Sequence, residues 1–420
     1  MAASLDRPLG FTEALCAEWY DAIPDGLQVV GALAWGEPIA ADDLRAAVAR
    51  VRARHPALAS CIVRGADDVW RFATAPGDRV ELRVIPAGSA WRDRYAAALA
   101  EPLDLTRALW RVELVVDPAD APEPAVLIVT ACHAVLDGIS LAQVLHDLVT
   151  DDASTGSRAP LAPCASMEDL LPAHAPATAG TPAPGTVPEA ECWRVEQPAP
   201  ASARTFGFTD RTVDAAVVRA LHERARAEHT TLAAALMVAC CRARTAVPGH
   251  RPLVGFNVPF DLRSRVTPPI PAATVGAYFG RAHVFGDGPD ADRDPWAAAR
   301  TLDDALRADI ATAAPPPAWD ATTVRALVAG LCRDDRTTFD LAYLLTDLGR
   351  VDLGPHASGM WCTTVQTTGV EALVVSAAGV AGALDLGIGW PRPLTGDATA
   401  TAFADALVAG VHALAQPLSH

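Results

Sequence analysis

The residues best placed for chemistry in this sequence are a histidine and an aspartate that lie between a predicted strand and a predicted helix. Residues 125–132 form a continuous apolar run, the pattern of a strand covered on both faces, and His133 follows at its end. Asp137 and Gly138 come next along the chain. A helix is then predicted to begin near Ile139, because apolar residues recur at helical spacing, at Leu141, Val144, Leu145 and Leu148.

This arrangement favours an uncharged histidine. A helix N-terminus carries partial positive charge, which disfavours a nearby imidazolium and keeps the ring neutral near pH 7. A neutral imidazole is the form that a general base requires. A simpler interpretation also fits, in which His133 is a structural residue and Asp137 caps the helix. The spacing alone leaves both interpretations open.

The chain that must position these residues is long enough for two hydrophobic cores. It has 420 residues, of which 51% are hydrophobic and 20% are charged. Predicted strands and helices follow one another in a mixed α/β pattern, which includes a helix over 91–100 and strands over 110–116 and 275–284. Proline and alanine dominate between Thr150 and Ala201, and such a stretch is typical of a linker. We therefore expect an N-terminal subdomain over residues 1–150, a linker over 151–200 and a C-terminal subdomain over 201–420.

The charge excludes several classes of function. The basic residues are all arginines, so a Schiff-base lysine is excluded, and so is a phosphate-binding loop of the GxxxxGK type. The formal net charge of −16 argues against nucleic acid, whose binding depends on neutralising phosphates. It also makes an acidic partner less natural, unless a local patch of arginines overrides the global field.

The location in the cell is predicted from two further patterns. We expect no signal peptide, because no basic and apolar leader precedes Gly10, and no membrane span, because the apolar run over 232–241 is too short. The nine cysteines are scattered and form no CxxC or Cys/His cluster. This favours reduced thiols in the cytoplasm over a disulfide framework or a metal site.

A family resemblance rests on several segments in a fixed order. The segment from Cys132 through His133 to Asp137 and Gly138 resembles the HHxxxDG motif of the condensation-domain superfamily, which includes the polyketide-associated acyltransferases and, more distantly, chloramphenicol acetyltransferase. Further matching segments are ARHPALASCIV, EPLDLTRALWRVELVV, the DLRSR and TVGAYFG segments within 253–285, and TDLGRVDL. Two departures stand out: Cys132 replaces the first motif histidine, and Ala59 replaces the second arginine of an RHxxLR element.

The resemblance implies a fold and a reaction. The fold is two chloramphenicol-acetyltransferase-like α/β subdomains that form a V, with the motif histidine in a central tunnel. In the reaction, His133 is the general base that takes a proton from an acceptor as it attacks a thioester. The Gly138 amide helps to neutralise the developing negative charge.

The neighbouring residues have supporting roles in this interpretation. Cys132 is expected to be a buried, inert thiol, and a Cys132 nucleophile is disfavoured because adjacent strand residues point to opposite faces. The motif aspartate is expected to pair with an arginine of the C-terminal half, which locks the histidine loop. Three candidates for that partner of Asp137 stay open at this stage, namely Arg263, Arg265 and Arg350.

The expected activity is transfer of an acyl group from a CoA or carrier-protein thioester to a hydroxyl or amine of a natural-product acceptor. No metal and no permanently bound cofactor is expected, since acyl-CoA or acyl-phosphopantetheine is the cosubstrate, and the protein is expected to act as a monomer. Two other classes remain: a condensation-like enzyme that cyclises or otherwise converts a bound intermediate, and a non-catalytic docking platform. The intact HxxxDG segment argues against the platform, and Ala59 mildly favours it.

Overall fold

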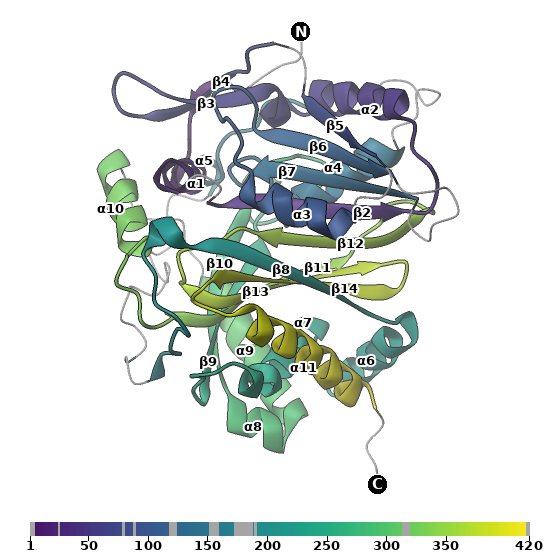
Figure 1. Cartoon of the computed structure of the whole chain (residues 1–420), viewed down its shortest axis with the longest axis vertical. Coiled ribbons are helices and arrows are strands. Elements are labelled where there is room, and N and C mark those ends of the chain that lie inside the picture. The colour runs from purple at the N-terminus through teal and green to yellow at the C-terminus, as the bar shows by residue number, and fades with distance from the viewer. Residues whose placement is uncertain are drawn as a thin grey trace.

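The computed structural model describes residues 5–23, 26–77, 80–86, 90–116, 124–150, 159–171, 188, 191–312 and 320–416. Two α/β layers lie one above the other in Figure 1, with the N-terminus at the top of the upper layer and the C-terminus at the bottom of the lower one. Each layer is built on its own sheet, and the sheets face one another.

The upper layer contains a five-stranded sheet with the order β12-β2-β7-β6-β5. Its strands are β2 (Gln28–Trp35), β5 (Glu81–Ile85), β6 (Trp110–Val116), β7 (Ala125–Cys132) and β12 (Ala357–Thr364). Helices α2 (Ala41–Arg54) and α4 (Gly138–Thr150) pack against each other on this layer. Helix α3 (Trp91–Ala100) contributes its apolar side chains to a core shared by the two layers.

The lower layer contains a six-stranded sheet with the order β10-β9-β11-β13-β14-β8. Its strands are β8 (Thr205–Val213), β9 (Leu253–Asp261), β10 (Phe279–Asp287), β11 (Leu341–Arg350), β13 (Glu371–Val380) and β14 (Ala383–Arg392). Figure 1 shows its helices on the side away from the upper layer. They are α6 (Ala215–Ala227), α7 (Leu232–Ala243), α8 (Gly288–Arg293), α9 (Pro295–Thr312) and α11 (Asp397–Ala415).

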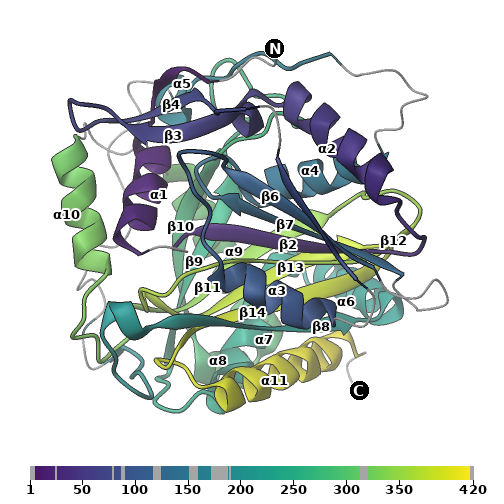
Figure 2. The same ribbon diagram turned by 45° about the horizontal axis from the view of Figure 1, so that its top comes forward.

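A smaller group of elements closes one side of the molecule, as Figure 2 shows. A three-stranded sheet with the order β1-β4-β3 lies beside helix α1, and α1 packs on α10. Their bounds are β1 (Arg7–Pro8), β3 (Ser60–Arg64), β4 (Trp70–Thr74), α1 (Phe11–Ala22) and α10 (Ala321–Leu331), and short helical turns occur at α5 (Met167–Leu170), Pro56–Ala59, Ala201–Ala203 and Arg244–Ala246.

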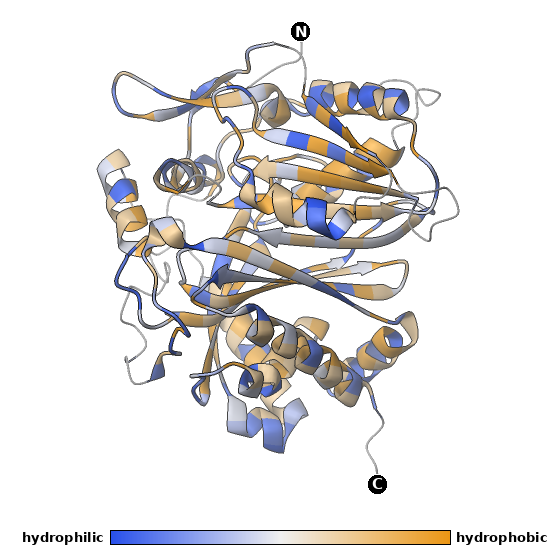
Figure 3. Ribbon diagram, in the orientation of Figure 1, coloured by the Kyte–Doolittle hydropathy of each residue, from blue (hydrophilic) through white to orange (hydrophobic). Residues whose placement is uncertain are grey.

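One strand from the C-terminal half of the chain joins the sheet of the N-terminal half. Strand β12 belongs to the C-terminal half of the sequence, yet it pairs antiparallel with β2 at the edge of the N-terminal sheet. Figure 3 shows both apolar and polar stretches on the strands of the two sheets and on the helices that cover them. The predicted fold class, α/β with two chloramphenicol-acetyltransferase-like subdomains, is confirmed, while the predicted V shape with a central tunnel stays a prediction.

Most of the predicted elements near the motif are confirmed. The strand over 125–132, the strand over 110–116 and the helix over 91–100 have the predicted bounds. The strand predicted over 275–284 is wrong at its start, because β10 begins at Phe279 and the preceding backbone bonds to the motif loop instead of a neighbouring strand.

The predicted linker over 151–200 is only partly described, since 151–158, 172–187 and 189–190 lie outside the described residues. Within the described part, Met167 packs into a small apolar cluster with Leu262, Val266 and Ile270 of the C-terminal half. The division at 1–150, 151–200 and 201–420 stays a prediction.

Helix α11 is long and apolar enough, by length and composition, to cross a membrane. Its residues Phe403, Leu407 and Val411 are fully buried in the C-terminal core, and the helix packs on α7. A core helix of a globular protein passes the same test, so α11 is weak support for a span.

Candidate active site

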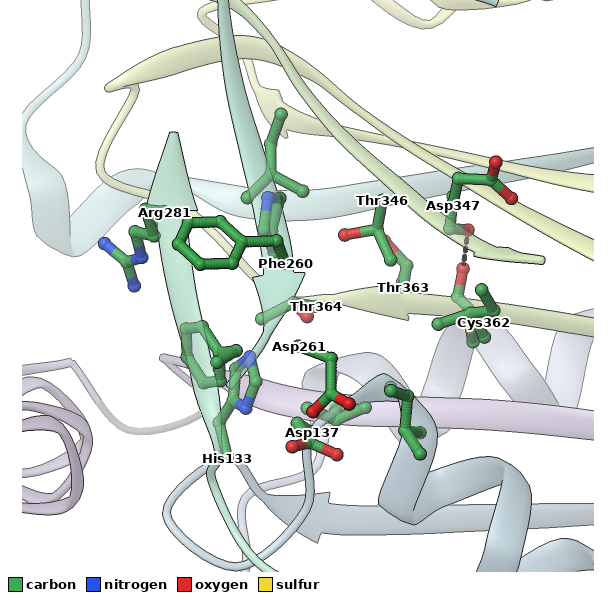
Figure 4. Close-up of a pocket in the computed structure, with 18 of the residues that line it drawn as sticks. His133, Asp137, Phe260, Asp261, Arg281, Thr346, Asp347, Cys362, Thr363 and Thr364 are labelled. Carbon is green, nitrogen blue, oxygen red and sulfur yellow. Dashed lines mark hydrogen bonds between the residues drawn. The ribbon is translucent and has the colours of Figure 1, made fainter. Parts of the chain in front are cut away.

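His133 lies at the junction of the two layers. It follows the last residue of β7, and its backbone N–H donates to the carbonyl of Leu27 (3.1 Å). Its side chain lines a cavity of about 160 Å³ whose walls come from both halves of the chain. Figure 4 shows His133 and Asp137 on the wall from the N-terminal half, opposite Phe260 and Thr346 of the C-terminal sheet.

The imidazole is held neutral. It stacks on the ring of Phe279, with ring centroids 5.0 Å apart and an interplanar angle of 26°. Burial lowers the pKa of His133 to about 4, and the guanidinium of Arg281 acts in the same direction while Asp137 opposes it. The Nδ1 atom is buried within the protein. Nε2 is therefore the nitrogen left to accept a proton from the cavity.

Asp137 is fixed by hydrogen bonds from both halves of the chain. Its Oδ1 accepts from the backbone N–H of Ser140 (2.7 Å), which is the bond of a helix N-cap. Its Oδ2 accepts from the backbone N–H of Tyr278 (3.0 Å), and its own N–H donates to the carbonyl of Gly276 (3.2 Å). The carboxylate thus ties the start of α4 to the segment before β10.

Arg263 is the candidate arginine that pairs with Asp137. Its Nη1 lies 2.9 Å from Oδ2, and its Nη2 lies 3.1 Å from Oδ1, so the pair is bidentate. Nη2 also donates to Ser140 Oγ (2.8 Å), and Nη1 donates to Asp261 (3.0 Å). Burial alone would lower the pKa of Arg263, but Asp137 and Asp261 outweigh it and raise that pKa above its ordinary value.

The other two candidate arginines lie elsewhere. Arg265 is exposed, donates to the carbonyl of Ile310 (3.1 Å) and stacks over Phe260. Arg350 is exposed at the end of β11. Among the described residues, the pairing with Asp137 therefore belongs to Arg263.

Gly138 is the first residue of α4 and lines the cavity. A Cβ atom at this position would lie 2.5 Å from Cδ2 of Leu348, which also lines the cavity. Close packing of Leu348 thus explains a glycine here, beside its position at the helix start.

Cys132 is fully buried and does not appear among the residues that line the cavity. Burial raises the pKa of its thiol to about 12, so almost no thiolate is present at neutral pH. This environment fits the expected inert thiol and does not favour Cys132 as a nucleophile.

Several residues of the cavity wall were not singled out from the sequence. Phe279 and Arg281 are among them, and so are Thr364 and Gln366. The apolar spacing of α4 and β10 marks the buried positions only, so the sequence carries no signal for the polar ones that face a cavity. Among the residues that the structure describes, no three His, Cys, Asp or Glu side chains come together as they would around a metal ion.

Part of the chain matches the model of a known protein family. Residues 202–316 match the family model "Phthiocerol/phthiodiolone dimycocerosyl transferase C-terminus". No curated protein matches over the chain.

Solved structures match over nearly the whole length. Polyketide synthase associated protein 5 from Mycobacterium tuberculosis has 16% identity and a TM-score of 0.69, and 100% of each chain is covered. The first condensation domain of the calcium-dependent antibiotic synthetase has 16% identity and a TM-score of 0.68, with 98% of this chain and 97% of that chain covered. The epimerization domain of tyrocidine synthetase B has 13% identity and a TM-score of 0.66, with 99% and 97% covered.

The layered sheets and the cavity between them define a condensation-domain-like α/β protein. The predicted resemblance to the condensation-domain and chloramphenicol-acetyltransferase-like superfamily is confirmed at the level of the fold over the whole chain, and residues 202–316 add the match to the transferase family model.

Proposed function

We propose that this protein is an acyltransferase that moves an acyl group from a CoA or carrier-protein thioester to a hydroxyl or amine of a natural-product acceptor. The observation that carries the proposal is a neutral imidazole, His133, in a cavity between the two layers, with its loop fixed by a bidentate Asp137–Arg263 pair. A positioned base of this kind contributes about 10²- to 10⁴-fold to a rate.

In the proposed reaction, His133 Nε2 takes the proton of the acceptor as its oxygen or nitrogen attacks the thioester carbonyl. The carbon–sulfur bond breaks, and the thiol leaves with the proton that the imidazolium returns. The backbone amide of Gly138, at the start of α4, is a candidate donor to the oxyanion. Asp137, Arg263 and the buried Cys132 act by holding this geometry.

The proposal requires no bound metal and no permanent cofactor, since the thioester is itself the cosubstrate. As part of the same proposal, the protein is a monomer and works in the cytoplasm. Support for a reducing compartment comes from the nine cysteines, all of which are free thiols.

The test compares the wild-type protein with His133→Ala and, as a neighbouring control, Cys132→Ala. Free thiol release from acyl-CoA and acyl-carrier donors is followed with a panel of alcohol and amine acceptors, and thermal unfolding checks the fold. We expect His133→Ala to lose transfer by about 10²-fold or more while Cys132→Ala keeps most of it. Full activity in a folded His133→Ala protein would refute the proposal, and loss of activity in Cys132→Ala alone would point to a covalent route.

A further inference from the structure

Arg281 is a charged residue of the cavity wall that the proposed mechanism does not use. It lies on β10 two residues after Phe279, and its guanidinium carbon lies 5.7 Å from the centroid of that ring. The same Phe279 ring stacks on the imidazole of His133, the candidate base, with ring centroids 5.0 Å apart. Arg281 is therefore one ring away from the reacting position.

The charge of Arg281 is uncompensated within the cavity. Among the described residues, the structure gives the guanidinium of Arg281 no ion pair and no hydrogen bond. The other cavity guanidinium, Arg263, is in contrast neutralised by Asp137 and Asp261. The remaining carboxyl of the wall, Asp347, is at the opposite end of the cavity in Figure 4 and accepts from the N–H of Gly349 (2.9 Å).

A buried acid that interacts electrostatically with Arg281 compensates its charge poorly. Glu371 is 4% exposed and does not line the cavity, and its Oε1 accepts from the side-chain amide of Asn257 (2.8 Å). Burial raises the pKa of Glu371, which disfavours its anion, although Asn257 and Arg281 oppose that effect. The end of the cavity beside Arg281 is thus locally positive in a chain whose net charge is −16.

We propose that Arg281 is a specificity-determining residue that binds a carboxylate carried by one of the two substrates, next to the carbon at which acyl transfer occurs. A guanidinium on an aromatic ring keeps its donors free in its own plane, which suits bidentate binding of a carboxylate. A phosphate of the donor is a poorer fit, since it is a full pantetheine arm away from the thioester carbon. This inference rests on the proposed acyl transfer and narrows its substrates to carboxylated ones.

The carboxylate belongs either to the acyl group, as in a monothioester of a dicarboxylic acid, or to the acceptor, as in a hydroxy or amino acid. The test therefore has two arms, both measured as equilibrium binding by calorimetry without turnover. The donor arm compares succinyl-CoA with butyryl-CoA, whose CoA phosphates are identical and cancel. The acceptor arm compares a hydroxy acid, 6-hydroxyhexanoate, with its primary amide.

We expect the wild-type protein to bind the charged member of one pair about 10- to 100-fold more tightly, the usual value of a charge-assisted hydrogen-bonded pair. Arg281→Gln should remove that preference and leave binding of the neutral member unchanged. Arg265→Gln, an exposed arginine outside the cavity wall, is the matched control and should keep it. The arm that shows the preference identifies which substrate carries the carboxylate.

Two outcomes overturn the inference: no preference in either arm, or an Arg281→Gln variant that weakens charged and neutral ligands equally. The second would mean that Arg281 acts on His133 or on the fold alone. Failure of the proposed function is distinguishable, because it would leave the binding preference in place while no thiol is released with any acceptor. Transfer without preference would refute only the role of Arg281.

Discussion

The guanidinium of Arg263 binds the carboxylate of Asp137 through both terminal nitrogens, with Nη1 2.9 Å from Oδ2 and Nη2 3.1 Å from Oδ1. The two residues are 126 positions apart and come from different layers of the fold. Both are buried, at 3% and 4% exposure. The pair therefore works as a clamp that fixes the loop carrying His133 against the C-terminal half.

We expect Arg263→Ala to destabilise the protein by about 3–5 kcal/mol, because removing one partner leaves the Asp137 carboxylate buried without its counter-charge. Transfer activity should fall together with stability, since the histidine loop loses its contact with the C-terminal half. Urea unfolding and thiol-release assays measure the two effects. Arg263→Lys should recover only part of the loss, because an ammonium cannot make the bidentate contact.

Arg265→Ala is the control for that experiment. Arg265 is exposed and gives up only a hydrogen bond to the carbonyl of Ile310 and a contact with Phe260, so a change of less than about 1 kcal/mol is expected. Equal effects of Arg263→Ala and Arg265→Ala on stability and rate would contradict the role of the Asp137–Arg263 pair in fixing the histidine loop.

The pH dependence of the reaction should reflect the lowered pKa of His133. A general base is inactive when protonated, so kcat/KM should fall on the acid side as pH drops through about 4, the value to which burial lowers the pKa of His133. Between pH 6 and 8 this group should cause no loss. A stopped assay of kcat/KM against pH, corrected for unfolding at low pH, measures the limb. A limb near the ordinary histidine value of about 6.5 would mean that the ring is more solvated than its stack on Phe279 implies.

The strand, the histidine and the helix of the motif were predictable from the sequence because their signals are local. An apolar run and a helical repeat depend only on neighbouring residues, and they locate His133 and Gly138 within a residue of the observed boundaries. That the aspartate pairs with an arginine of the other half came from the family resemblance. The resemblance could not select Arg263 over Arg265, because the partner of Asp137 depends on which way the backbone turns after β9.

Other features required the tertiary structure. The segment 275–278 has the composition of a strand, but its backbone groups bond to Asp137 and Ser140 of the other layer. The crossing of β12 to the edge of β2 joins residues more than three hundred positions apart, and no local pattern encodes it. Arg281 had no signal, since a strand position shows its polar character in the sequence but not whether it faces a cavity.

Gly138→Ala should reshape the cavity while the helix still forms. The added methyl group would lie 2.5 Å from Cδ2 of Leu348, so the leucine side chain must move within the wall. Alanine is itself a better helix former than glycine, so we expect stability to change by less than about 1–2 kcal/mol. The effect should appear as a raised KM more than a lowered melting temperature. A variant with unchanged kinetics would show that Leu348 moves aside freely.

A second buried polar contact, between His55 and Asp147, lies behind the motif helix. His55 Nε2 is 2.9 Å from Asp147 Oδ2, and the two side chains are 1% and 0% exposed. The side-chain amide of Gln143 donates to Asp147 Oδ1 (2.9 Å), and the Nε atom of Arg54 lies 3.6 Å from Asp147 Oδ2. Although burial alone would raise the pKa of Asp147, these partners hold it below its ordinary value. The contact joins the end of α2 to α4, whose first residue is Gly138.

Asp147→Asn keeps the shape of the side chain and removes its charge, so it tests this pair with little change in packing. Because the folded pKa of Asp147 is depressed, its contribution to stability is present above the unfolded value of about 3.9 and is lost as pH falls through the folded value. We expect the variant to be about 1.5–3 kcal/mol less stable at pH 7, with the difference shrinking below about pH 4. A double-mutant cycle with His55→Gln, followed by urea unfolding at both pH values, isolates the pairwise energy. If the cycle shows no coupling at pH 7, His55 acts by packing alone, and α4 is held by its apolar face rather than by this hydrogen-bonded contact.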